Sequence, residues 1–534
     1  MDMPLPPLLR RTVVDVITVA AEQSPDATAV RDRTQHLTYH QLLQEARAVA
    51  GGLHAHSVSR GDAVLIMLDN HVDFVLAWLG TATLGAIEVP INTAYKGLML
   101  AHQIRDSGAS VLIVEAEYAH RVNDIITDIP ALRTIIVRGQ DDRWHEPRQL
   151  TRHTFDSIRE QPPLVTAPPS ATDLMAIMYT SGTTGPSKGV RVTHAHAYGY
   201  CTPALYGAAS AEDTVLVVLP LFHIGGQWAG VYNALTAGAE CVILDRFHVS
   251  TYWDDVREFG CTYTLLLGAM ATFLFNKPAS ANDRTVPLRR ALMVPAIAQV
   301  EEFSERFDCK IATAYGSTEA STPLYTAFGE AQYGTCGTLR PDFEARLVDA
   351  DDIEVEPGTA GELVLRSHEP WTLMDGYHQN PSATANAWRN QWLHTGDAFI
   401  RDDDGHYRFV DRTKDALRRR GENISSFEVE AGAVLHPDVV ECAAVGVRSA
   451  HTEQEILLVV KKAPHSILTA PELIDFMNDR LPKFMVPRYI RFTDELPRTP
   501  TQKIKKNELR SQGLTPDTWD RERSGNAHPT VTTP

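Results

Sequence analysis

Short apolar runs separated by longer stretches of helical periodicity dominate the chain. The first strand-like run, 63–68, precedes a helical stretch from 74 to 85. Four more runs repeat the pattern, at 111–114, 215–219, 241–244 and 263–267. Buried strands that alternate with helices are typical of proteins with largely buried sheets. The pattern therefore predicts an α/β fold.

The pattern changes near residue 410. A basic cluster interrupts an acidic chain, at Arg412, Lys414, Arg418, Arg419 and Arg420. Beyond it the periodicity predicts a small α+β domain, with strands at 439–447, 455–462 and 489–492 and a helix at 471–481. The polar end, 511–534, is predicted to be a loose tail. We predict a large N-terminal domain at 1–411, a hinge at 412–416 and a small C-terminal domain at 417–510.

The bulk composition is typical of a soluble globular protein with more than one domain. The 534 residues exceed what one hydrophobic core usually supports. Hydrophobic residues make up 43% of the chain and charged residues 22%. The net charge of −17 argues against a general nucleic-acid binder, which would normally be basic. A phosphate ligand therefore needs a local site that works against the overall charge.

Six cysteines are scattered along the chain without a C-x-x-C pair, at Cys201, Cys241, Cys261, Cys309, Cys336 and Cys442. This usage is typical of a reduced cytosolic enzyme and argues against zinc ribbons or a disulfide framework. The N-terminus lacks the order of charge, apolar run and cleavage site that marks a signal peptide. No apolar stretch approaches about 18 residues, so we expect a cytoplasmic protein without stable membrane insertion.

A glycine-rich loop, Tyr179–Gly189, carries the strongest chemical signal. Its three glycines allow the backbone to approach a ligand, and its hydroxyl groups and single lysine suit a polyphosphate. A Walker A loop would place a glycine before the lysine and a helix after it. Here Ser187 precedes Lys188. The apolar run before the loop, 174–178, is typical of a buried strand, and the residues after it, 190–193, alternate like a second strand. The loop is therefore predicted to bind polyphosphate between two strands.

A glycine-rich loop between two strands resembles the phosphate loop of the adenylate-forming superfamily. That superfamily includes acyl-CoA synthetases, aryl-CoA ligases, luciferases and nonribosomal-peptide adenylation domains. Five further segments are similar to its motifs and follow in its order: Pro220–Gly226, Ala314–Glu319, Trp392–Asp397, Asp411–Ser425 and Pro497–Ile504. The segment KDALRRRGENISSFEVE, at 414–430, most resembles the carnitine/crotonobetaine-CoA ligase-like group. The resemblance implies a large multi-subdomain N-terminal domain of layered β-sheets and helices, and a small mobile C-terminal domain.

By this resemblance, the ligands of the site are ATP, Mg²⁺ and CoA. Tyr315 would stack on adenine, Asp397 would bind the ribose, and Arg412 would contact the ribose or a phosphate. Glu319 and Thr184 would supply oxygen ligands to Mg²⁺, which binds through few carboxylates and phosphate oxygens. The residues implied to bind nucleotide or CoA are Thr180, Ser181, Gly182, Thr183, Thr184, Gly185, Lys188, Ala296, Tyr315, Gly316, Asp397, Arg412 and Gly421.

The resemblance also implies catalytic roles for Lys503, His223, Thr318 and Glu319. Lys503 would be the catalytic lysine, Thr318 would donate to the α-phosphate, and His223 would lie where the acyl group meets the adenylate. Lys414 would be the hinge about which the small domain rotates between the two half-reactions. Gln502 stands where the family usually has glycine, and a non-glycine takes a positive φ only at a cost of about 1 kcal/mol. The loop before Lys503 is therefore expected to differ in shape.

The implied acid pocket contains many small residues, and its predicted members are His223, Gln227, Trp228, Gly268, Ala269, Met270, Val294, Pro295, Ala296 and Ala314. This set contains no acidic residue. An amino-acid substrate would require a carboxylate for its ammonium group. We therefore expect a roomy, mainly apolar cavity for a bulky or extended organic acid.

These features together predict an ATP-dependent acid–thiol ligase, an AMP-forming acyl-CoA synthetase. The enzyme would convert a small-molecule carboxylic acid to an acyl-adenylate with release of pyrophosphate, and then to a CoA thioester with release of AMP. Transfer of the acyl group to a carrier protein or an amine stays open, as do a single half-reaction, luciferase-like chemistry and a homodimer. A non-catalytic homologue is expected to have lost Lys503 or Glu319, and this chain retains both.

Overall fold

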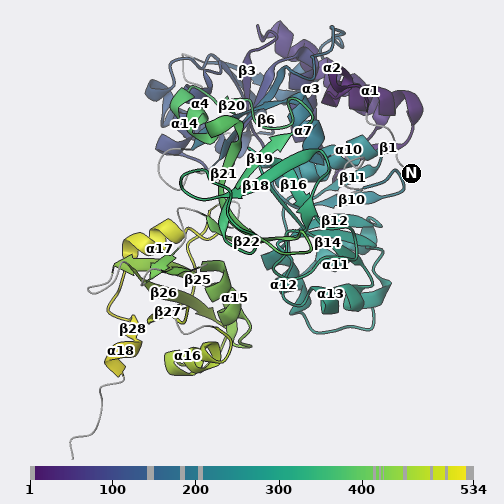
Figure 1. The fold of residues 1–534 in the computed structure, drawn as a ribbon. Coiled ribbons are helices and arrows are strands. Elements are labelled where there is room, and N and C mark those ends of the chain that lie inside the picture. The colour runs from purple at the N-terminus through teal and green to yellow at the C-terminus, as the bar shows by residue number, and fades with distance from the viewer. Residues whose placement is uncertain are drawn as a thin grey trace, which may run out of the picture. The chain divides into compact units, whose positions relative to one another are not determined.

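The computed structural model describes residues 6–140, 150–180, 187–201, 209–412, 417–419, 422–424, 426–448, 454–481, 485–499 and 503–524 (Figure 1). The chain forms two compact units. The first contains Met1–Ala345, Val364–Thr395 and Asp404–Tyr407, and the second contains Arg346–Leu363, Gly396–Asp403 and Arg408–Pro534. The two units draw on alternating segments of the chain, and the domain boundaries at 411 and 416 stay predictions.

An eight-stranded sheet forms one layer of the first unit. Its order is β20 (Gly376–Tyr377), β9 (Lys188–Thr193), β8 (Leu174–Thr180), β4 (Ile87–Pro90), β3 (Ala63–Met67), β5 (Val111–Glu115), β6 (Thr134–Arg138) and β7 (Thr151–Thr154). The strands from β8 to β7 are parallel, whereas β9 and β20 are antiparallel to their neighbours. The predicted strands at 63–68 and 111–114 are both in this sheet.

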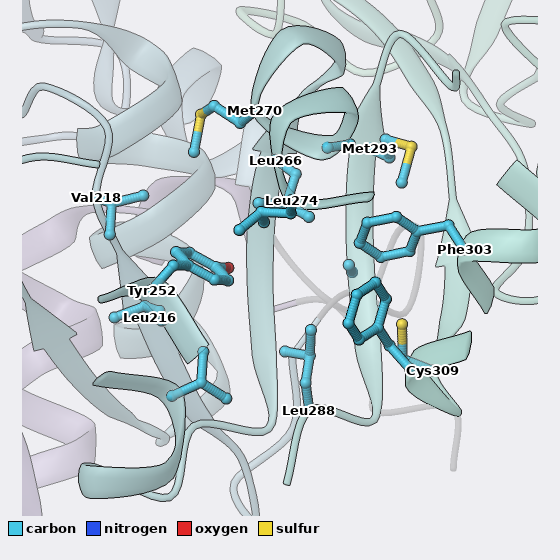
Figure 2. Close-up of a cluster of buried hydrophobic side chains, with 14 of the residues drawn as sticks. Leu216, Val218, Tyr252, Leu266, Met270, Leu274, Leu288, Met293, Phe303 and Cys309 are labelled. Atoms are coloured by element: carbon cyan, nitrogen blue, oxygen red, sulfur yellow. The ribbon is translucent and has the colours of Figure 1, made fainter. Parts of the chain in front are cut away.

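A seven-stranded sheet forms a second layer. Its order is β14 (Lys310–Ala312), β13 (Arg290–Val294), β12 (Tyr263–Leu267), β10 (Thr214–Val217), β11 (Glu240–Ile243), β1 (Thr28–Arg31) and β2 (His36–Thr38). Only β2 is antiparallel to its neighbour among these pairings. Apolar side chains of β12 and β13 pack against neighbouring helices, and Figure 2 shows Leu266, Met293, Tyr252 and Phe303 in this cluster. The α/β prediction is confirmed.

The helices of the first unit are α1 (Val13–Gln23), α2 (Tyr39–Ala55), α3 (Val72–Leu84), α4 (Gly97–Ser107), α5 (Ala116–Asn123), α6 (Phe155–Arg159), α7 (His194–Cys201), α9 (Ile224–Gly226), α10 (Asn233–Ala237), α11 (Tyr252–Glu258), α12 (Gly268–Phe275), α13 (Val300–Phe307) and α14 (Pro381–Ala387). A π-helix, η3 (Gln227–Tyr232), and 3₁₀ turns η1 (Leu8–Arg10), η2 (Ile126–Asp128), η4 (Asp283–Thr285) and η5 (Arg389–Gln391) complete the set. The local sequence explains where several of these helices begin or end. Thr38 and Gln41 form a capping box at the start of α2, and Gly85 ends α3 with φ at 75°.

Two smaller sheets follow in the chain. The first consists of β15 (Ala314–Ser317), β16 (Ser321–Tyr325) and β17 (Thr338–Leu339), all antiparallel. The second has the order β18 (Phe343–Val348), β19 (Gly361–Ser367), β21 (Leu393–Arg401) and β22 (Tyr407–Arg412). These sheets carry the turns on which several predicted site residues lie.

The C-terminal part of the second unit is α+β, as predicted. A hairpin of β23 (Leu417–Arg419) and β24 (Glu422–Ile424) precedes a four-stranded sheet of β25 (Val439–Arg448), β26 (Gln454–Lys462), β27 (Tyr489–Thr493) and β28 (Trp519–Asp520). Its helices are α15 (Ser426–Val434), α16 (Ala470–Asn478), α17 (Lys506–Gln512) and α18 (Arg521–Ser524). Apolar clusters line both faces of the sheet.

The start of the predicted loose tail is part of this sheet. Trp519 and Asp520 form β28, which pairs antiparallel with β27. Arg488 binds both carboxylate oxygens of Asp520 at 3.1 Å and Glu522 at 2.8 Å. This segment is mostly polar, so its hydropathy gave no sign of a strand. A bidentate ion pair holds it, together with the packing of Trp519 on an apolar cluster of the sheet.

Buried histidines on α7 predict acid sensitivity of the first unit. His196 is fully buried, and burial lowers the pKa of its imidazole to about 3. In the unfolded chain the pKa is about 6.5, so below that pH the unfolded state takes up a proton that the folded state excludes. The free energy of unfolding should therefore fall by about 1.4 kcal/mol per pH unit for this one residue as the pH drops from about 6.5.

The measurement is the thermal midpoint of the wild type and of His196→Leu between pH 7.5 and pH 5. The variant should lose less stability on acidification, because leucine takes up no proton. His40→Leu is the matched control for the change of histidine to leucine, since His40 is exposed on α2. Parallel slopes for the wild type and His196→Leu would show that His196 does not carry this acid sensitivity.

Candidate active site

The predicted phosphate loop joins two paired strands. β8 and β9 are antiparallel, and Thr180 faces Lys188 across the last pair before the loop. This confirms a strand on both sides of the loop, which a Walker A loop does not have. Ser181, Gly182, Thr183, Thr184 and Gly185 lie outside the described residues, so their ligand roles stay predictions.

Helix α4 anchors both ends of the loop. The Tyr179 hydroxyl donates to Asp106 Oδ2 at 2.6 Å, and a ring nitrogen of His102 lies 2.9 Å from the Ser187 carbonyl oxygen. Gln103 Nε2 also donates to Ser187 Oγ at 3.3 Å. Because one helix holds the residues before and after the loop, its two ends are fixed relative to each other.

Glu319 connects this loop to a second predicted motif. The Thr180 hydroxyl donates to Glu319 Oε1 at 3.4 Å, and the Tyr377 hydroxyl donates to the same oxygen at 3.1 Å. Lys188 Nζ lies 4.8 Å from the centre of the Tyr377 ring, within range of a cation–π interaction. Burial, followed by the charge of Glu319, raises the pKa of Tyr377, so its hydroxyl stays a donor. Residues far apart in the sequence thus form one polar cluster.

The turn that carries Glu319 requires a glycine at position 316. A side chain on Gly316 would place its Cβ 2.6 Å from the Ser321 carbonyl oxygen, which is shorter than any normal contact. Beyond it, the Ala320 amide donates to Ser317 Oγ at 3.1 Å. Thr318 is buried within this turn, and Tyr315 is half-buried on β15. The predicted Y-G-x-T-E segment therefore forms a tight, fixed turn.

The oxygen atoms at Glu319 and Thr180 are suitable ligands for a magnesium ion that also binds phosphates. Mg²⁺ binds through one or two carboxylates, keeps several waters and takes phosphate oxygens. Glu319 offers a carboxylate beside the Thr180 hydroxyl, and no cluster of three or more acidic, histidine or cysteine ligands occurs within the described ranges. The site therefore suits a metal that arrives with a nucleotide better than an all-protein metal cage.

The residues predicted to line the acid pocket come from neighbouring elements. The π-helix η3 contacts β12, α12 contacts β13, and β13 contacts β15. His223 caps α9, where its Nδ1 accepts from the Gly225 amide at 3.1 Å. A Cβ on Gly268 would lie 2.9 Å from the Pro295 carbonyl oxygen. The structure thus brings together the four parts of the chain that carry the predicted pocket residues, at 223–228, 268–270, 294–296 and 314.

Burial differs among these predicted pocket residues. Gln227, Trp228 and Ala314 are buried, and Met270 and Ala296 belong to the apolar cluster of Figure 2. Ala269 is exposed at the start of α12. The assignment of all these residues to an acid pocket stays a prediction.

A buried carboxyl group that the sequence reading missed contacts this region. Glu88 on β4 accepts a hydrogen bond from Gln227 Nε2 at 2.5 Å, and both side chains are buried. The predicted pocket residues themselves include no acid, but Glu88 brings a carboxyl group into contact with one of them, Gln227. An acidic residue inside the apolar run 87–90 was the available signal, because a buried charge needs a partner.

The second unit carries the predicted ribose and hinge residues. Asp397 is buried on β21 directly after Gly396, which has φ at 73° and donates its amide to Glu362 Oε1 at 2.9 Å. β22 ends at Arg412. Lys414 and Gly421 lie outside the described residues. The roles of these four residues stay predictions.

Lys503 lies in a short hairpin of the second unit. The Thr499 amide donates to the Lys503 carbonyl at 2.7 Å, and Arg498 and Ile504 form an antiparallel bridge. The Lys503 side chain is exposed. Further along the same segment, Lys506 Nζ lies 2.8 Å from Glu430, and Lys505 Nζ lies 3.8 Å from Glu508. Gln502 lies outside the described residues, so the predicted effect of this substitution on the loop is untested.

Together the layered fold, the loop between β8 and β9 and the Glu319 turn define an adenylate-forming enzyme. The sequence model of the AMP-binding enzyme family matches residues 17–378, and that of the AMP-binding enzyme C-terminal domain matches residues 428–503. The chain belongs to the AMP-binding enzyme family.

Relatives and solved structures agree with this assignment. The chain is 30% identical to a crotonobetaine/carnitine–CoA ligase of Salmonella typhimurium over 488 residues, 89% of this chain and 93% of the relative. The anthranilate CoA ligase AuaEII in complex with anthranoyl-AMP has a TM-score of 0.85 and 26% identity, covering 96% of this chain and 98% of the other. The o-succinylbenzoate CoA synthetase MenE from Bacillus subtilis, in complex with the acyl-adenylate OSB-AMP, has a TM-score of 0.79 and 25% identity, covering 92% of this chain and 97% of the other. The predicted resemblance and the class of acid–thiol ligase are confirmed.

None of the helices in the described ranges combines the length and the apolar character that crossing a membrane requires.

Proposed function

We propose that the protein joins an organic acid to CoA through an acyl-adenylate. The acid carboxylate attacks the α-phosphate of ATP, which forms the acyl-phosphate bond and releases pyrophosphate. The CoA thiolate then attacks the acyl carbon, which forms the thioester and releases AMP. The observation that carries this proposal is the Thr180–Glu319 hydrogen bond, because it joins the phosphate loop to the Y-G-x-T-E turn in one cluster.

The first half-reaction brings two anions together. At about 4 Å and an effective dielectric of about 20, two unit charges repel by roughly 4 kcal/mol. Lys503, the loop between Thr180 and Lys188, and Glu319 with its metal would offset this repulsion. Bound Mg²⁺ supplies positive charge to the phosphate oxygens. Catalysis would therefore depend on positioning and electrostatic stabilisation, without a protein nucleophile.

The remaining site residues take the roles that the family motifs give them. We assign Tyr315 and Gly316 to adenine, Thr318 to the α-phosphate and Asp397 to the ribose. Arg412 is assigned to the ribose or a phosphate. Rotation about Lys414, in the hinge 412–416, would exchange Lys503 for the face carrying Gly421, which would line the pantetheine tunnel. Hinge rotation of this kind is an ordinary way to switch between two states of a site.

The acid is proposed to be bulky or extended and mainly apolar. Buried aromatic and small side chains support this class, because Trp228 packs edge-to-face on Tyr200 at 5.5 Å between ring centres, and Gly268 lies against Pro295. We place the reaction in the cytoplasm, since all six cysteines are free thiols.

A pyrophosphate-release screen tests this function. Aromatic, fatty and polycyclic acids and acetate are each supplied with ATP and Mg²⁺, with and without CoA. We expect release with bulky acids and thioester only when CoA is present. Turnover restricted to acetate would contradict the proposed acid class. Acyl transfer to a carrier protein or an amine in preference to CoA, at a fixed acid, would replace the proposed acceptor.

A further inference from the structure

A buried carboxyl group and a buried amide face each other beside the predicted acid pocket. Glu88 lies on β4 of the eight-stranded sheet and Gln227 on the π-helix η3, and Gln227 Nε2 donates to Glu88 Oε1 at 2.5 Å. Their exposed fractions are 1% and 0%. The residues in register with Glu88 on the neighbouring strands are Val64 and Ala176, both apolar. The pair is therefore isolated from water in an apolar setting.

Each side chain has one oxygen that lacks a donor. Glu88 Oε2 and Gln227 Oε1 are both buried, and neither has a hydrogen-bond partner within the described ranges. An ionised carboxylate and an amide oxygen can only accept, so they cannot satisfy each other. Leaving two buried acceptors unpaired is costly, and a buried unpaired charge is more costly still.

A single proton on Glu88 would remove the buried charge and would also give both unpaired oxygens a hydrogen-bond partner. If Glu88 carries a proton on Oε2, its hydroxyl can donate to Gln227 Oε1 while Gln227 Nε2 donates to Glu88 Oε1. The two side chains then form a cyclic acid–amide pair in which every polar atom has a partner. Burial raises the pKa of Glu88 to about 8, although the bond from Gln227 opposes this. The raised pKa agrees with the geometry.

We propose that Glu88 is a neutral carboxylic acid in the working enzyme, and that its cyclic pair with Gln227 is a positioning element that favours acid substrates without a positive charge. This inference rests on the proposed function and on the prediction that Gln227 belongs to the wall of the acid pocket. Glu88 acts through Gln227, whose amide it holds in one orientation. Because the pair is neutral, the wall offers no counter-ion to an ammonium group.

Two aromatic side chains near Gln227 are also uncharged. Trp228 follows it in η3, and the Trp228 ring lies 6.0 Å from the ring of His196, whose pKa burial lowers to about 3. Aromatic rings alone attract a cation only weakly compared with the cost of burying it. Together with the neutral pair, they favour an uncharged acid of the same size.

Infrared difference spectroscopy tests the proton without turnover. The wild type minus Glu88→Gln spectrum should contain the carbonyl band of a protonated carboxylic acid. Glu115→Gln is the matched control, because Glu115 is buried on β5 of the same sheet but pairs with His71 at 2.5 Å and Arg138 at 3.4 Å. Its difference spectrum should contain carboxylate bands only. Absence of the acid band at Glu88 would overturn the inference.

Acid preference tests the positioning role. The two substrates are an acid ending in a tert-butyl group and the same acid ending in trimethylammonium, which differ in charge at similar size. Glu88→Gln keeps both hydrogen bonds, since an amide can replace a protonated acid, and the ratio of kcat/KM for the two acids should stay within about threefold. Glu88→Leu loses both bonds, so the KM for the neutral acid should rise about tenfold while the KM for ATP stays unchanged.

Two outcomes separate this inference from the proposed function. A preference of the wild type for the trimethylammonium acid that Glu88→Gln abolishes would show an ionised Glu88 and overturn the inference. An acid band without pyrophosphate release from any acid would contradict the proposed function while the neutral pair stands. A thermal midpoint for Glu88→Leu shows whether that variant folds, and Glu88→Gln keeps the test decisive if it does not.

Discussion

Lys503→Ala should reduce pyrophosphate release from acid and ATP by about 10³-fold, the effect expected when one key electrostatic group is lost from a transition state. The lysine is proposed to offset the charge that builds up as the carboxylate meets the α-phosphate. The second half-reaction does not need this charge, because the attacked acyl carbon already carries AMP as a leaving group. The same variant should therefore convert a supplied acyl-adenylate and CoA to thioester at close to the wild-type rate.

Lys505→Ala is the matched control for this experiment. Lys505 lies two residues further along the chain, is also exposed, and is 3.8 Å from Glu508. Its replacement removes the same charge from the same segment and should leave both half-reactions nearly unchanged. Pyrophosphate release that survives Lys503→Ala would refute the assignment of the catalytic lysine. Equal loss of both half-reactions would indicate a folding defect of the hairpin.

Sequence patterns predicted the elements whose signals are local. The runs at 63–68, 111–114, 241–244 and 263–267 became strands because uninterrupted apolar residues mark a sheet buried on both faces. The π-helix η3 was not predicted, since it differs from an α-helix by a shift in hydrogen bonding that leaves little trace in hydropathy. β28 was missed because its single apolar residue, Trp519, is too short a signal to predict a strand, and the Arg488–Asp520 ion pair that helps to hold it leaves no trace in hydropathy.

Motif order indicated which residues share a site, but not the contacts that complete it. Thr180 and Glu319 were expected near one nucleotide, and they lie within a hydrogen bond of each other. Tyr377 joins them only because β20 pairs with β9, a neighbour relation between segments more than 180 residues apart. Sheet order of this kind is set by packing of the whole unit. The sequence does contain a sign of Glu88, an acidic residue inside an apolar run. Its contact with Gln227, however, depends on tertiary packing in the same way.

Glu319→Gln should lower pyrophosphate release by about 10²- to 10³-fold and raise the Mg²⁺ concentration needed for half-maximal rate. Glutamine keeps the size of the side chain and one oxygen that can accept from Thr180 and Tyr377, so the turn should keep its shape. What it loses is the negative charge that a hard divalent cation requires. The measurement is a Mg²⁺ titration of pyrophosphate release at saturating acid and ATP.

Tyr377→Phe separates the charge of Glu319 from its hydrogen bonds. This change removes the 3.1 Å hydrogen bond but leaves the carboxylate ionised, and it keeps the aromatic ring beside Lys188. The loss should be about 1 kcal/mol, or a factor of about five in rate, with no change in the half-maximal Mg²⁺ concentration. If Glu319→Gln and Tyr377→Phe instead had the same Mg²⁺ dependence as the wild type, Glu319 would not be a metal ligand. Its carboxylate would then serve to tie the turn to Thr180, and the charge on the phosphates would have to be offset by other groups, such as Lys188 and Lys503.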